Sequence, residues 1–216
     1  MPISFYDLTV GSYVQIVEAA TGFLQKGADH FAAKDIDPGE IVETRLFPDM
    51  ANFHFQVTSL NHHSLGAVRA YQSGEFRPPK YPDCGYAELQ AMTKKSLDAL
   101  KALSRNEVDA LGEGKVVFKI GGNEIPFTAR NFALSFSLPN FYFHATTAYD
   151  ILRLKGVPLG TPASLGAAEP RARPPPARGW PPAEESSGFP PGRDCGLCLD
   201  PSGPTFGSCW SLRCSS

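Results

Sequence analysis

The chain has 216 residues, of which 42% are hydrophobic and 19% are charged, and its formal net charge at pH 7 is −2. These proportions are ordinary for a globular protein. Proteins that bind nucleic acid through its phosphates carry clustered Lys and Arg, and this sequence has no such cluster. We therefore expect no nucleic-acid partner.

The sequence also lacks the signals of secretion and membrane insertion. Its first ten residues have neither the basic start nor the apolar run of a signal peptide, and no run of about 18 apolar residues exists to span a membrane. Cys84 is the single cysteine before residue 190. Because this usage fits a reducing compartment, we expect a cytoplasmic protein with no membrane partner.

The composition changes abruptly near Gly160. Residues 161–216 contain eleven of the twenty prolines and no Ile, Val, Tyr, Lys or His. Proline interrupts helices, and too few branched and aromatic residues remain to offset the entropy of ordering the chain. We therefore expect a helical bundle domain over 1–157 and a disordered Pro/Arg/Cys-rich tail over 158–216. Our hypothesis for the origin of the tail is a shifted reading frame or a gene-model error.

The tail contains two cysteine pairs, Cys195 with Cys198 and Cys209 with Cys214. Their spacing superficially resembles a four-thiolate zinc site. The surrounding residues show no helix or strand pattern that would hold the ligands, so an accidental cluster is the preferred interpretation.

Four segments before the break show helical periodicity. The first has apolar or small residues at this spacing from Phe5 to Gly27, and a turn is expected after it at 37–39. The second is expected to begin near Pro48, a residue suited to a first helical turn, and to reach about Tyr71.

The third helix is expected over about 86–111. The strand-like runs 116–120 and 124–127 on either side of Gly121-Gly122 predict a short β-hairpin between 115 and 127. The fourth helix is expected in two parts, 128–136 and 139–155. The pattern predicts an all-α fold, an antiparallel four-helix bundle with a β-hairpin inserted before the last helix.

Helical spacing turns two histidines toward the interior of this bundle. His63 borders the apolar stripe of the second helix, and His144 lies in the middle of the inner stripe of the fourth. Asn140 lies one turn before His144 on the same face. A pair of hydrogen-bonded core histidines is the simplest interpretation. A divalent metal such as zinc or nickel is the alternative, because neutral imidazole is a common ligand, although a catalytic site needs about three protein ligands.

The other histidines are expected outside the core. His62 is rotated by about 100° from its neighbour and is expected to face outward. His30 and His54 are expected on the solvated surface.

The last helix resembles an uncharacterised branch, a domain of unknown function, of the DinB/YfiT-like helical-bundle superfamily. The resemblance rests on the run from Leu138 to Arg153 followed by Gly156-Val157. Residues 46–50 and the run 56–59 before His62-His63 fit the same branch. The resemblance covers about residues 1–160 and implies a four-helix bundle that is often dimeric. Many members look like metal-dependent enzymes, including thiol-cofactor S-transferases and isomerases.

The resemblance also implies where a metal site would lie. In that superfamily one His from the second helix and an H-x-x-x-H pair from the last helix usually hold the metal. His63 matches the first position and His144 the second His of the pair, but the first His of the pair falls on Asn140. An amide oxygen is a weak ligand for such metals. The implied metal site of His63, His144 and Asn140 is therefore incomplete.

Two functions follow from the sequence. The first is a non-enzymatic or degenerate-site member that binds a small ligand or a partner and forms a homodimer. The alternative is a metal-dependent enzyme of the thiol S-transferase or isomerase type with a His-containing pocket. Asn140 favours the first. The sequence has no G-x-S-x-G, P-loop or dinucleotide-binding motif, so we predict no particular catalytic residue and no organic cofactor from it.

Overall fold

The computed structural model describes residues 3–81 and 83–160. This part is mainly helical with one small three-stranded sheet, which confirms the predicted helical class. Of the predicted tail, residues 161–216 lie outside the described residues. No helix in the described ranges is long and apolar enough to cross a membrane.

The first helical segment begins with a π-helical turn, η1 (Asp7–Gly11), and continues as α1 (Ser12–Lys34). It ends at Asp35, which has the left-handed conformation (φ 54°). The expected turn at 37–39 is the start of a short helix, α2 (Pro38–Val42). The Asp37 carboxylate caps this helix by accepting a backbone N–H two residues later (2.9 Å), which satisfies one of the free donors at the helix start.

The second segment consists of α3 (Phe53–Asn61), a π-helical turn η2 (His62–Gly66) and α4 (Ala67–Ser73). The prediction that it begins near Pro48 is wrong. The helix begins five residues later because the Asn52 side chain accepts the backbone N–H of Phe55 and caps it there (3.0 Å).

The third segment is α5 (Tyr86–Lys101), α6 (Arg105–Ala110) and a 3-10 turn, η3 (Leu111–Glu113). The prediction of one helix over 86–111 is wrong, because Ser104 has an extended backbone (ψ 132°) and starts a new helix. The apolar spacing continues through the break, so periodicity alone did not reveal it.

The sheet contains β1 (Glu75–Phe76), β2 (Lys115–Ile120) and β3 (Asn123–Thr128), in the order β1-β2-β3. β2 and β3 pair antiparallel, from Lys115 opposite Thr128 to Ile120 opposite Asn123. Gly121 and Gly122, which join them, both have positive φ (55° and 84°), a conformation that glycine adopts readily in a tight hairpin turn. β1 pairs parallel to β2, and the sequence analysis did not predict it.

The last segment is continuous, from α7 (Ala129–Phe132) through the π-helical turn η4 (Ala133–Ser137) to α8 (Leu138–Leu154). Pro139 lies in the first turn of α8 and does not interrupt the chain. The segment ends before Gly156, which has positive φ (84°).

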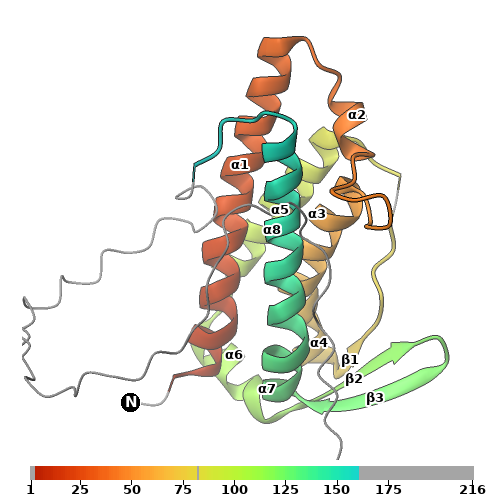
Figure 1. The fold of residues 1–216 in the computed structure, drawn as a ribbon. Coiled ribbons are helices and arrows are strands. Elements are labelled where there is room, and N and C mark those ends of the chain that lie inside the picture. The colour runs from red at the N-terminus through yellow and green to blue at the C-terminus, as the bar shows by residue number, and fades with distance from the viewer. Residues whose placement is uncertain (1–2, 82, 161–216) are drawn as a thin grey trace, which may run out of the picture. The chain divides into compact units, whose positions relative to one another are not determined.

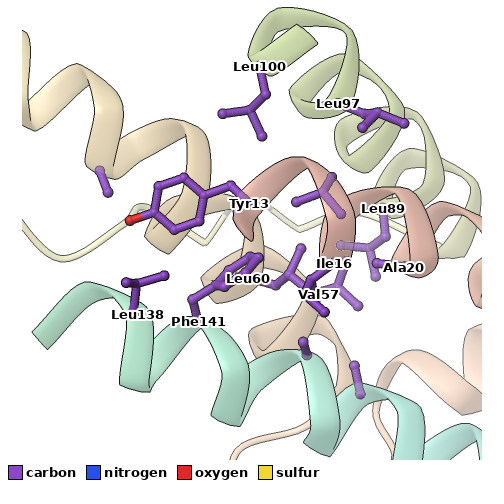
Figure 2. Close-up of a cluster of buried hydrophobic side chains, with 14 of the residues drawn as sticks. Tyr13, Ile16, Ala20, Val57, Leu60, Leu89, Leu97, Leu100, Leu138 and Phe141 are labelled. Carbon is purple, nitrogen blue, oxygen red and sulfur yellow. The ribbon is translucent and has the colours of Figure 1, made fainter. Parts of the chain in front are cut away.

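The helices α1, α3, α5 and α8 lie beside one another, and the β2-β3 hairpin extends from one end of them (Figure 1). The core between them is apolar and drawn from all four helices (Figure 2). Its buried side chains include Tyr13, Ile16, Ala20, Val57, Leu60, Leu89, Leu97, Leu100, Leu138 and Phe141. The buried hydroxyl of Tyr13 in this core forms hydrogen bonds with the hydroxyl groups of Tyr71 and Ser137 (3.1 Å each).

Candidate functional site

His63 and His144 lie against each other in the interior. Their ring centroids are 5.7 Å apart with 22° between the ring planes, and the residues are 7% and 8% exposed. His63 lies in η2, and its backbone carbonyl accepts a hydrogen bond from the Ser137 hydroxyl at the end of η4 (2.8 Å). Two π-helical turns therefore meet beside the histidine pair. Such turns are rare and are frequent at functional sites.

His144 is fixed by a buried carboxamide. Gln56 uses its amide nitrogen to donate to the Ala51 carbonyl (3.0 Å), so its oxygen is the atom that faces His144 Nδ1 (2.8 Å). This assigns the proton of the neutral ring to Nδ1 and leaves the Nε2 lone pair available. Burial lowers the pKa of His144 to about 4, so the ring is neutral near pH 7.

His63 has an incomplete set of hydrogen bonds. Its Nδ1 atom is buried and has no hydrogen-bond partner among the described residues. Aromatic rings of Phe76 and Phe136 lie at 5.4 and 5.6 Å from its ring. Burial, followed by repulsion from charge on His144 and His62, lowers the pKa of His63 to about 3. The pair is therefore two neutral imidazoles in an aromatic environment.

Asn140, the third predicted ligand, is held by a hydrogen bond within its own helical segment. Its side chain is half-buried, and its amide nitrogen donates to the Phe136 carbonyl one turn earlier (2.7 Å). Within the described ranges, no three His, Cys, Asp or Glu side chains are grouped so as to hold a metal ion. The donor set near the pair is two imidazoles and carboxamides, which fits a transition metal poorly.

The predictions for the remaining histidines need correction. His54 was expected in solvent, but it is 9% exposed and its Nε2 contacts the Cys84 sulfur at 3.2 Å. His62 was expected to face outward, but it is half-buried and its Nε2 contacts the carbonyl of Arg77 (2.7 Å). His30 is also half-buried. The segment between α4 and α5 covers two of these rings, and helical spacing cannot show its path.

Sequence reasoning missed two parts of the site. Gln56 lies two turns before His63 on the same helical segment, and this spacing was a signal for a shared face. Phe76 lies in β1, and no periodicity in the sequence placed that strand beside the histidines. The site therefore depends on a strand as well as on helices.

Most of the described part of the chain matches a known protein family. The family described as Domain of unknown function (DUF1993) matches residues 5–163. The crystal structure of a DinB family member protein from Shewanella denitrificans is similar to this chain, with 27% sequence identity and a TM-score of 0.63. The alignment covers 78% of this chain and 95% of that one. The comparison with curated proteins gave no match. The chain belongs to the DUF1993 family and is DinB-like.

Proposed function

We propose that this domain binds a small molecule without catalysing a metal-dependent reaction, in the interior at His63, His144 and Asn140. The observation that carries the proposal is the buried His63 Nδ1, which has no partner among the described residues. An unpaired buried polar atom costs about 1–3 kcal/mol, and a ligand with a complementary group would recover this cost.

The chemistry of the pair favours an uncharged ligand. Both imidazoles are neutral near pH 7 because burial lowers the pKa of each, so neither attracts an anion. The lone pair on His144 Nε2, assigned from the bond between Nδ1 and Gln56, is an acceptor for a ligand N–H or O–H. The rings of Phe76 and Phe136 beside His63 supply apolar surface.

We also propose that the helices form an antiparallel four-helix bundle. Packing of α1 against α5 and of α3 against α8, with further contacts between α3 and α5 and between α1 and α8, supports it. In such a bundle the ligand site lies between facing helices, which agrees with histidines from η2 and α8. The single cysteine before residue 190 supports the predicted cytoplasmic location.

Ligand binding is tested by native mass spectrometry of the full chain purified from its own cells. We expect a non-covalent small-molecule adduct that His144→Ala removes and that His30→Ala, a half-buried histidine away from the pair, retains. An adduct with the same occupancy in both variants, or no adduct in the parent chain, would argue against the site.

A metal-dependent enzyme of the thiol S-transferase or isomerase type is the second candidate. The ring separation of 5.7 Å favours it, because two imidazoles at about this distance are able to share one ion with nitrogen–zinc distances of about 2.0–2.1 Å. His63 and His144 would then hold the ion, with the Asn140 amide oxygen as a weak third ligand. A bound zinc ion would supply Lewis-acid chemistry.

Elemental analysis of the purified full chain separates the two candidates. The tail cysteines, Cys195, Cys198, Cys209 and Cys214, are replaced by Ser so that they contribute no metal. Our proposal predicts no stoichiometric zinc or nickel. Stoichiometric metal that disappears on His63→Ala would contradict our proposal and support the enzyme candidate.

We also propose a homodimer that uses the outer face of α8. Tyr142 and Phe143 are 43% and 53% exposed there, and large exposed aromatic side chains are enriched at protein interfaces. Light scattering after size-exclusion chromatography should give twice the chain mass, with Phe143→Ser shifting the protein to monomer. Ile120→Ser, at a hairpin residue with 44% exposure, is the matched control and should leave the dimer intact.

A further inference from the structure

A second candidate site lies in an open groove of about 890 Å³. One side is formed by the end of α3, η2 and α4, and the other by α5. β1 and the following residues 77–80 close the groove at its edge. We call it the α4–α5 groove. His63 and His144 do not line it, so it is distinct from the histidine pair.

The α4–α5 groove carries excess positive charge. Arg69 and Lys80 line it, are exposed, and have no ion pair with any residue in the described ranges. The acidic residue of its lining, Glu75, is already paired with both Arg77 and Lys119. Two cations are therefore left uncompensated at this surface, which favours an anionic group.

The groove lining also contains buried polar atoms that have no partner among the described residues. Thr58 and Asn61 line the groove and are 5% and 6% exposed. Thr58 Oγ1 and Asn61 Oδ1 have no hydrogen-bond partner among the described residues. The Asn61 amide nitrogen donates to the Val57 carbonyl and the Thr93 hydroxyl (2.8 and 3.0 Å), so the amide orientation is fixed. Its oxygen is left as an unused acceptor.

The groove lining also includes apolar side chains and the ring of His62. Leu65, Phe76 and Met92 contribute apolar side chains to the lining. The His62 Nε2–H donates to the carbonyl of Arg77 (2.7 Å), since a carbonyl oxygen only accepts, and its ring packs on Phe76 at 4.3 Å between centroids. These contacts join Phe76 and Arg77 at the edge of the groove to η2.

We propose that the α4–α5 groove binds a small amphipathic organic anion. Its oxyanion head group binds Arg69 and Lys80, and its apolar body packs on Leu65, Phe76 and Met92. A concave, mostly apolar surface with a few charged groups is typical of small-molecule sites. The charge and the groove lining carry this inference, which does not depend on ligand binding at the histidine pair.

The test uses two fluorescent probes that share an aromatic body and differ in charge. The first, 8-anilinonaphthalene-1-sulfonate, is an anion, and the second, N-phenyl-1-naphthylamine, is uncharged. Titration of the full chain should show saturable binding of the anionic probe. Arg69→Gln and Lys80→Gln should each weaken it by at least about fivefold, the range expected for loss of one charge-assisted contact, and leave the affinity for the neutral probe unchanged.

Lys26→Gln is the matched control, because Lys26 is an exposed residue of α1 that does not line the groove. It removes the same charge and should change the affinity for the anionic probe by less than about twofold, since distant surface charges are screened by salt. Equal weakening in all three variants, or no weakening in Arg69→Gln and Lys80→Gln, would overturn the proposal.

Competition identifies the head group. Octanoate and octyl phosphate each displace the anionic probe from the parent chain if their head group suits the groove, and the stronger competitor identifies carboxylate or phosphate as the preferred anion. Failure of both to displace the probe would contradict the assignment.

Discussion

The two interior imidazoles, of His63 and His144, differ in their hydrogen bonds. His144 has a defined tautomer because Gln56 accepts from its Nδ1, whereas His63 Nδ1 is buried with no partner in the described part of the chain. Both rings resist protonation, since burial disfavours the charged form. The pair therefore makes the stability of the domain depend on pH.

Acid should destabilise this domain through the histidine pair. The pKa is about 4 for His144 and about 3 for His63 in the folded chain, against about 6.5 in an unfolded one. Between these values the unfolded state binds protons that the folded state does not. The free energy of unfolding therefore falls as the pH drops below about 6.5, by up to about 1.4 kcal/mol per pH unit for each histidine.

Urea denaturation between about pH 5 and about pH 7 measures this slope. His144→Gln removes one of the two titrating groups and should reduce the slope. An unchanged slope in the variant would show that the ring of His144 is not kept neutral by burial.

Thr58 offers a second test at a single side chain. Its buried hydroxyl has no partner among the described residues, so Thr58→Val should raise the free energy of unfolding by about 1 kcal/mol by removing an unsatisfied polar group. Thr93→Val is the matched control. Thr93 accepts from Asn61 and donates to the Leu89 carbonyl, so its loss should cost about 1–3 kcal/mol. A lower denaturation midpoint for Thr58→Val would show that the hydroxyl is satisfied in solution.

Residue spacing was sufficient to predict that His63 and His144 point inward, because both lie on helical segments with a clear apolar stripe. It failed for His54. That ring is covered by Cys84 and faces Tyr81 at 6.3 Å, and both come from an irregular segment without periodicity. The surroundings of a side chain are predictable only when its neighbours also lie in regular elements.

The helices pack closely enough that single glycines matter. On α1, a Cβ added at Gly27 would meet the Tyr86 hydroxyl oxygen and lie 3.3 Å from the Leu152 side chain. The Tyr86 hydroxyl is itself fixed by donation to the Leu24 carbonyl (2.8 Å). Gly27→Ala should therefore lower the free energy of unfolding by about 1–3 kcal/mol, as overpacking does in cores.

Gly22 is the matched control on the same helix. A Cβ added there meets nothing within 4 Å, so Gly22→Ala should stabilise the chain by up to about 1 kcal/mol through helix propensity alone. Chemical denaturation of both variants checks the pair. Similar effects of the two substitutions would contradict the packing of α1 against α5.

The elements differ in how far the sequence predicted them. The β2-β3 hairpin was predictable because β-branched and aromatic residues stand on both sides of two consecutive glycines. The strand β1 could not be predicted from the sequence, because it has only two residues and its partner strand lies about 40 residues away in the chain. The π-helical turns η2 and η4 were also hidden, since one extra residue per turn leaves no distinct pattern over five residues.

At the scale of the whole molecule, packing continues past the predicted domain end at 157. Leu159 is 3% exposed, and the Tyr149 hydroxyl bonds to the carbonyl oxygens of Leu159 and Gly160 (3.2 Å each). Val157 is fully buried and accepts from Arg153 (3.0 Å). We propose that these residues complete the folded domain and that 161–216 add nothing to its stability.

Shortened chains test this boundary. A chain that ends after Gly160 should melt at the temperature of the full chain. One that ends after Lys155 loses two buried apolar side chains, each worth about 1.5–3 kcal/mol, and should melt several degrees lower. A chain ending after Gly160 that melts well below the full chain would contradict the boundary.

We propose that the inward imidazoles of His63 and His144 hold no metal in this chain, because Asn140 stands where the resemblance implies a third ligand. Calorimetric zinc titration of the parent chain and of Asn140→His, both with the tail cysteines replaced by Ser, tests it most directly. We predict no stoichiometric zinc binding by the parent and one zinc per chain in Asn140→His, lost again when His63→Ala is added. Stoichiometric binding by the parent chain that His63→Ala abolishes would contradict the account.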